Sequence, residues 1–173
     1  VHFMIPEIKT ILYATNLGPE ASHVFRYAVS QAQHYQARIH VLHVIEPLGE
    51  FARNLVEQYL SQDKAKEIQE KSRQYFIDQI KTRLTTFCEK ETCTLSEGNE
   101  LVQNISVLEG HPSDVIVKLA QELNADLIVL GTLRKTRISR SGLIGSTARQ
   151  VVNEAKTPVL TIHTPDDKLE KLD

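Results

Sequence analysis

Residues 127–153 contain the groups in this sequence that are best suited to binding an anion. The stretch has no acidic residue, and Ser146 and Thr147 follow Gly145 at a predicted helix start. Backbone N–H groups at a helix N-terminus bind anions, hydroxyl groups add donors, and glycine lets the backbone approach a phosphate. The basic side chains of the stretch raise the local positive potential, and they are Arg134, Lys135, Arg137, Arg140 and Arg149. These residues predict a phosphate-binding loop.

A solvated basic loop followed by an ordinary capped helix explains the same residues without a ligand. The residues alone leave both interpretations open. Neither G-x-x-x-x-G-K-[ST] nor a G-x-G-x-x-G after the first strand occurs. No nucleophile–base pair and no pair of carboxylates accompanies the stretch, so the sequence predicts a binding protein rather than an enzyme.

Alternating strands and helices must position this stretch. Short apolar runs typical of buried strands lie at 8–15, 37–44, 102–108, 127–131 and 159–163. Helical spacing of apolar residues is found at 19–35, 63–87, 110–123 and 145–155, with a short helix or helical loop at 51–60. This order predicts a doubly wound α/β domain, a parallel sheet with helices on both faces. We expect one domain over residues 5–164, with flexible termini at 1–4 and 165–173.

The helix at 63–87 and the segment after it are the places where a protein partner is expected. The helix has one apolar stripe, predicted to belong to the core, that comprises Ile68, Tyr75, Phe76, Ile80, Leu84 and Phe87. Residues 88–99 are polar and lack periodicity, which predicts a loop. Their two cysteines, Cys88 and Cys93, could form a reversible disulfide, although cytosolic conditions favour free thiols.

Composition excludes several classes of protein. The chain has 173 residues, 41% hydrophobic and 24% charged, and a net charge of −2, which favours a globular protein and argues against nucleic-acid binding. Apolar runs such as 127–130 are far shorter than a membrane span. The first residues resemble no secretion signal, so we expect a cytoplasmic protein without membrane contact.

Ligands of parallel sheets bind beyond the carboxyl ends of the strands, where the strand order reverses. Three segments are predicted to reach that edge: Ala14-Thr15-Asn16, His43-Val44 and Gly131-Thr132-Leu133-Arg134. We expect His43 to have a hydrogen-bonded structural role there.

The order of these segments resembles the universal stress protein family. The residues that carry the resemblance are Leu42-His43-Val44, Glu109-Gly110, 125–132, Gly145-Ser146 and Pro158-Val159-Leu160. The resemblance implies five parallel strands in the order 3-2-1-4-5, binding of ATP or AMP, with Mg²⁺ if ATP, and a homodimer that pairs through the last strand, 158–163. An apolar edge strand is commonly covered or paired, which supports the dimer.

Nucleotide-binding members of that family have G-x2-G-x9-G-[ST]. Gly131 matches the first glycine and Gly145-Ser146 the final pair, whereas Arg134 stands at the second glycine and the spacer is one residue longer. Arginine disfavours the backbone of a glycine turn but can supply a bidentate phosphate contact.

The same resemblance assigns roles at the other two segments. Asn16 stands where such members usually have an aspartate that binds the nucleoside, and Ala14 where many have proline. Val44 and Leu130 match the positions beside adenine. The candidate nucleotide-binding residues are Ala14, Thr15, Asn16, Val44, Leu130, Gly131, Thr132, Arg134, Gly145, Ser146 and Thr147.

The function expected from these residues is that of a non-catalytic stress-response module that binds adenine nucleotide and acts as a dimer. Two alternatives remain open. One is a nucleotide-free interaction or chaperone-like dimer, in which Arg134 and Asn16 mark a lost site. The other is a slow ATPase that uses the same loop with Mg²⁺.

Overall fold

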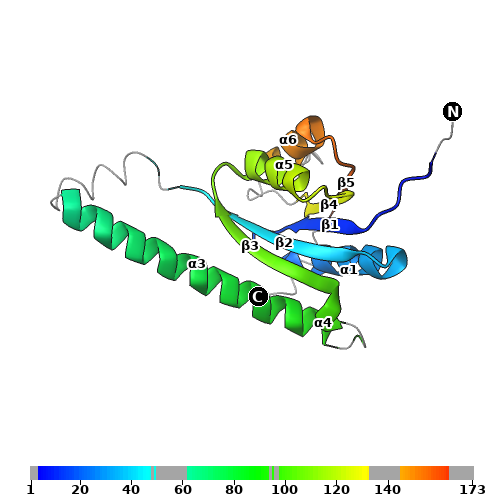
Figure 1. Ribbon diagram of the computed structural model, residues 1–173, viewed down its shortest axis with the longest axis horizontal. Coiled ribbons are helices and arrows are strands. Elements are labelled where there is room, and N and C mark those ends of the chain that lie inside the picture. The colour runs from blue at the N-terminus through cyan, green and yellow to red at the C-terminus, as the bar shows by residue number, and fades with distance from the viewer. Residues whose placement is uncertain are drawn as a thin grey trace.

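Five parallel strands form the central sheet (Figure 1). The computed structural model describes residues 4–47, 49, 62–93, 95, 98–132 and 145–163. The strands are β1 (Thr10–Ala14), β2 (Arg38–Ile45), β3 (Val102–Glu109), β4 (Leu127–Gly131) and β5 (Val159–Ile162). They lie in the order β3-β2-β1-β4-β5, which confirms the predicted doubly wound fold.

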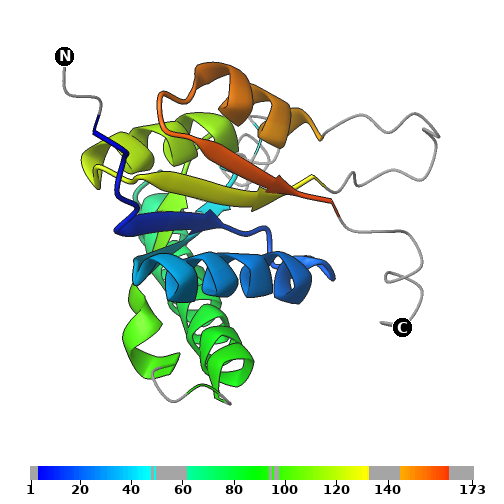
Figure 2. The same cartoon turned by 90° about the vertical axis from the view of Figure 1, so that its right-hand side faces the viewer.

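Helices cover both faces of the sheet, as Figure 2 shows. On one face lie α1 (Ala21–Tyr35) and the long α3 (Gln62–Thr92), and on the other lie α5 (Pro112–Glu122) and α6 (Ser146–Glu154). A short helix, α4 (Gly98–Leu101), leads into β3. None of the described helices combines the length and the apolar character that crossing a membrane requires.

The position of β1 in the middle of the sheet explains why its sequence is apolar throughout. Ile11, Leu12 and Tyr13 have no exposed surface. Ile11 and Tyr13 pack into the core beneath α1 and α3, whereas Leu12 packs into the separate core beneath α5 and α6. Successive side chains of a strand point to opposite faces, so a strand covered on both sides is apolar at every position.

The prediction of a loop at 88–99 is wrong at its beginning, because α3 continues to Thr92. Cys88 is buried in the core, and the Thr92 hydroxyl donates a hydrogen bond of 2.8 Å to the Cys88 carbonyl oxygen. This local bond and the burial of Cys88 stabilise the last helical turn despite its polar composition. At the other end of the segment, Gly98 and Asn99 belong to α4.

The predicted core stripe of α3 is also wrong for half its length. Leu84 has no exposed surface, and Ile80 and Phe87 pack against the same core. Ile68, however, is 51% exposed, and Tyr75 and Phe76 are each 63% exposed. The reason is geometric, since the first turns of α3 extend past the sheet (Figure 1).

Other expectations fall on residues outside the described ranges. These are the short helix at 51–60, most of the segment 132–144, and the tail from residue 164.

Candidate functional site

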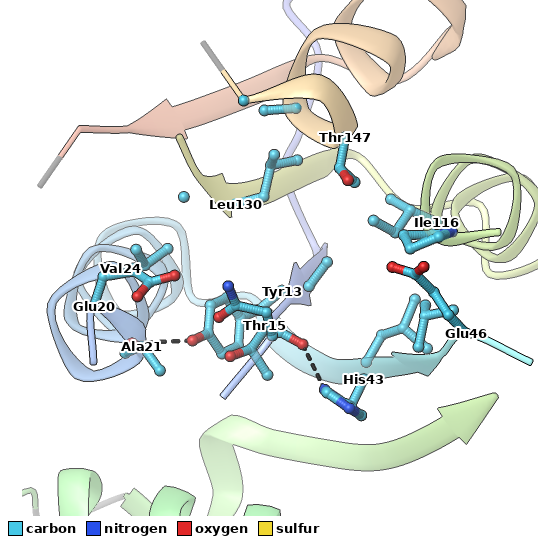
Figure 3. A pocket seen from close by; sticks show the side chains of 18 of the residues that line it. Tyr13, Thr15, Glu20, Ala21, Val24, His43, Glu46, Ile116, Leu130 and Thr147 are labelled. Carbon is cyan, nitrogen blue, oxygen red and sulfur yellow. Dashed lines mark hydrogen bonds between the residues drawn. The ribbon is translucent and has the colours of Figure 1, made fainter. Parts of the chain in front are cut away.

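A cavity of about 820 Å³ opens at the carboxyl ends of β1, β2 and β4 (Figure 3). This is where the strand order reverses, because β1 lies between β2 and β4 and the chain builds outward on both sides. Residues from β1, β2, β4, α1, α5 and α6 line the cavity, together with Ile80 of α3. Segments far apart in the sequence therefore converge there.

Nine of the predicted binding residues line this cavity, namely Ala14, Thr15, Asn16, Val44, Leu130, Gly131, Gly145, Ser146 and Thr147. Thr132 is not among them. Its hydroxyl oxygen lies 3.4 Å from both the Ile162 carbonyl oxygen and His163 Nδ1, so its side chain is directed toward β5. Arg134 lies outside the described residues.

Two polar side chains shape the turn between β1 and α1. Thr15 Oγ1 accepts a hydrogen bond of 3.0 Å from the Leu17 N–H, and Asn16 Oδ1 accepts one of 2.8 Å from the Gly18 N–H. Side chains of this kind form local turns with the backbone two residues on. The Asn16 oxygen, which we expected to face a nucleoside, is therefore used within the turn.

His43 connects the end of β2 to the residue after β1 through a side-chain hydrogen bond. Its Nδ1 lies 2.8 Å from the Thr15 carbonyl oxygen (Figure 3) and therefore donates to it, while the Thr15 N–H donates to the Leu42 carbonyl oxygen at 2.9 Å. This is the structural role that the sequence predicts for His43. Hydrogen bonds between two neighbouring strands therefore stabilise the floor of the cavity.

Tyr13 connects the floor to α1. Its hydroxyl donates a hydrogen bond of 3.0 Å to the Ala21 carbonyl oxygen, and burial raises the pKa of the phenol. The side chain therefore stays neutral at ordinary pH. It positions the first turn of α1 beside the cavity rather than supplying charge.

The N-terminus of α6 is the part of the cavity wall best suited to an anion. Gly145 occupies the N-cap position and, having no side chain, makes no cap hydrogen bond to the first turn. The first N–H groups of a helix have no partner within it. Gly145, Ser146 and Thr147 line the cavity, so the positive end of the helix dipole contributes to it. No side chain of the N-cap residue therefore occupies these N–H groups.

Gly131 is explained by packing as well as by access to a ligand. A Cβ added there would lie 3.0 Å from Val24 Cγ2, which is tighter than ordinary van der Waals contact. A glycine at the end of β4 therefore lets α1 lie close to the strand at the cavity edge.

Comparison with known proteins identifies the family. The family described as universal stress protein matches residues 7–163, nearly the whole chain. The chain belongs to the universal stress protein family. A universal stress protein from Thermus aquaticus is 30% identical over 158 residues, which is 89% of this chain and 98% of that protein. Universal stress protein MJ0531 from Methanocaldococcus jannaschii is 46% identical over 59 residues, only 34% of either chain.

Solved structures of the family share the fold. The structure of hypothetical protein MJ0577 has a TM-score of 0.65 at 22% identity and covers 93% of this chain and 99% of its own. A universal stress protein in complex with cAMP has a TM-score of 0.59 at 19% identity and covers 92% of this chain and all of its own (100%).

In this universal stress protein the cavity also holds acidic residues that the sequence reasoning did not place there. Glu20 lies at the N-cap of α1 and Glu46 follows β2, and both line the cavity. Among the described lining residues none is Lys or Arg. Glu20 falls at the start of the helix predicted at 19–35, but the sequence does not show the direction of its side chain, because that direction depends on the turn formed by Thr15 and Asn16.

The apolar lining was predicted only in part. Val44 and Leu130 were predicted to line the site, whereas Leu42, Val24 and Ile116 lie within predicted strands and helices and were given no role there. Helix periodicity shows that a residue such as Ile116 faces the sheet, but it does not show that the residue lies at the open end of the sheet.

Proposed function

We propose that this universal stress protein is a non-catalytic, cytoplasmic stress-response module that binds adenine nucleotide, ATP or AMP, in the cavity at the carboxyl edge of its sheet. With ATP, Mg²⁺ would accompany the triphosphate. The phosphates would lie against the first turn of α6, and the adenine between apolar side chains such as Val44 and Leu130.

One observation carries this proposal. The cavity joins an apolar wall, to which Val44, Leu130 and Ile116 contribute, to a helix N-terminus without a side-chain cap. An adenine nucleotide has the matching parts, an apolar base that excludes water and a phosphate that accepts N–H donors. The cAMP complex of a protein with the same fold supports the choice of an adenine nucleotide.

The decisive variant is Thr147→Glu. Thr147 lies in the first turn of α6, where a carboxylate stabilises a helix by roughly 0.3–1 kcal/mol but repels a phosphate. We expect the variant to unfold at the same temperature as the wild type or a higher one, and to lose at least tenfold in affinity for ATP with Mg²⁺, measured by isothermal titration calorimetry.

The matched control is Asn153→Glu, which adds the same charge near the other end of α6. We expect its affinity to stay within about twofold of wild type, since the dipole effect is confined to the terminal turn. Equal affinity for ATP in wild type and Thr147→Glu would contradict phosphate binding at α6. Absence of any binding by the folded wild type would favour the nucleotide-free dimer, for which the occupied Asn16 oxygen is the supporting observation.

A further inference from the structure

Glu20 is a buried side chain, and one of its carboxyl oxygens lacks a partner among the described residues. The residue is only 4% exposed, and its Oε2 has no hydrogen-bond partner among the residues that the structure describes. An unpaired buried charge is strongly unfavourable, so native proteins rarely keep one unless a ligand, an ion or a function requires it. Its place at a cavity wall, seen in Figure 3, points to a ligand.

A side-chain acceptor, the Asn16 amide oxygen, lies near the Glu20 carboxyl group. A Cβ added to Gly18 would lie 2.5 Å from Glu20 Oε2 and 2.9 Å from Asn16 Oδ1, so the two oxygens flank one small space. The Asn16 oxygen already accepts the Gly18 N–H. The described lining residues include no Lys or Arg, so none of them supplies a cation to Glu20, and a bound ligand can supply the donor.

Hydroxyl groups of a sugar fit this acceptor better than a directly bound metal ion. The described residues contain no group of three or more His, Cys, Asp or Glu side chains that could hold a metal, and Mg²⁺ prefers six oxygen ligands. An acidic side chain at the carboxyl edge of a nucleotide-binding parallel sheet is a general means of binding ribose hydroxyls. Glu20 also lies beside Gly131, where a Cβ would be 3.7 Å from Glu20 Cγ, between the strand end and the phosphate region.

We infer that Glu20 accepts hydrogen bonds from the sugar hydroxyls of the bound nucleotide and makes the site selective for ribonucleotides over deoxyribonucleotides. The inference rests on the proposed function. It assigns sugar recognition to Glu20 instead of Asn16, whose oxygen is engaged in the turn. A deoxynucleotide would leave the buried carboxylate without its donor.

The test compares ATP, 2′-deoxyATP and 3′-deoxyATP by calorimetry on wild type and Glu20→Gln. A hydrogen bond to a charged group corresponds to roughly a ten- to hundredfold difference in affinity. We expect wild type to bind ATP more tightly than at least one deoxy analogue by such a factor, and Glu20→Gln to reduce that preference to about threefold or less. The glutamine keeps the size of the side chain and removes its charge.

Glu154→Gln is the matched control, because it makes the same change in an exposed acid that does not line the cavity. Glu46→Gln tests the other acid of the cavity, which lies on the opposite side from Glu20. The ribose preference should persist in both variants. The inference is overturned if wild type binds the three nucleotides equally, if Glu46→Gln rather than Glu20→Gln loses the preference, or if the preference disappears when EDTA removes Mg²⁺. Failure of all three nucleotides to bind the folded wild type would instead refute the proposed function itself.

Thermal unfolding of the unliganded proteins separates a ligand-binding role from a structural one. Since the Glu20 Oε2 has no hydrogen-bond partner among the described residues, Glu20→Gln should be at least as stable as wild type. A clear loss of stability in the unliganded variant would mean that Glu20 has a partner in the free protein, and would overturn the inference.

Discussion

The Asn16 side chain lies at the cavity and takes part in the turn between β1 and α1. The resemblance assigned position 16 to the nucleoside, and the position does line the cavity. The structure adds that the side-chain oxygen closes the turn onto the Gly18 N–H. An amide and a carboxylate both accept such a bond, so the residue type alone does not reveal which group the oxygen faces.

The two cysteines differ in the chemistry available to them. Cys88 is 4% exposed, and burial, with a smaller effect of the Glu89 charge, raises the pKa of its thiol to about 12. Cys93 is exposed, and its sulfur lies 3.1 Å from the Lys90 carbonyl oxygen. The thiolate is the reactive form, and both cysteines are free in the structure.

We therefore expect one fast-reacting thiol in the folded protein at pH 8, that of Cys93. The reaction of Cys88 should require unfolding, and its thiolate should become populated only as the pH approaches about 12. Thiol titration with a chromogenic disulfide, followed by mass spectrometry, measures both. Cys93→Ser should remove the fast reaction. Two fast thiols, or a disulfide formed under mild oxidation, would contradict this prediction and support redox switching.

At the scale of elements, α3 consists of two parts with different roles. From Ile80 onward its apolar side chains pack beneath the sheet. Nearer its start, an ion pair of 2.7 Å between Arg73 Nε and Glu109 Oε1 links it to the end of β3. Between Asp63 and Phe76, every side chain that the structure describes is exposed except the half-buried Gln69.

Paired substitutions in α3 test this division. Leu84→Ala removes a fully buried side chain and should lower the free energy of unfolding by about 2–5 kcal/mol. Phe76→Ala removes a larger side chain that is mostly exposed and should change it by about 0.5 kcal/mol or less. Urea unfolding followed by circular dichroism measures both. Similar losses in the two variants would show that the first half of α3 is packed in solution.

The elements themselves were largely predictable from the sequence. Strands β1 and β4 are short, apolar and bounded by polar turns, and their predicted positions agree with the structure to within a few residues. The burial of the α3 stripe was predicted wrongly because periodicity identifies only which face of a helix is apolar. Burial also requires another element packed against that face at the same position along the helix axis. How far the sheet extends beneath Ile68 or Phe76 is a tertiary property.

At the scale of the molecule, β5 is an end strand of the sheet, with Val159, Leu160 and Thr161 only half-buried in the single chain. We propose that two chains pair along this strand, since exposed strand edges are commonly covered. Light scattering at micromolar concentration should give twice the chain mass of 19.6 kDa. Thr161→Lys should shift the mass toward the monomer because it places a charge on this edge.

Asn104→Lys, on the opposite edge strand β3, is the control and should leave the dimer intact. A wild-type mass equal to one chain would contradict the proposal. Loss of the dimer in Asn104→Lys but not in Thr161→Lys would move the interface to β3.

The candidate site was predictable where topology determines it. Parallel strands bring Ala14, Val44 and Gly131 to one edge, and a helix start at Gly145 brings the first turn of α6 beside them. Thr132 was misplaced because a residue one step beyond a strand can turn either way. Glu20 was missed because its burial depends on a turn, a helix start and a strand end meeting in three dimensions.

The first half of α3, which extends past the sheet, also affects how such a chain can evolve. Residues that support neither the core nor the cavity can be exchanged with little effect on folding, so Tyr75, Phe76 and their neighbours are under weak selection for stability. Sequence divergence among relatives should therefore concentrate there. A lineage could remodel this half-helix for a new binding partner while β1, β4 and the cavity stay unchanged.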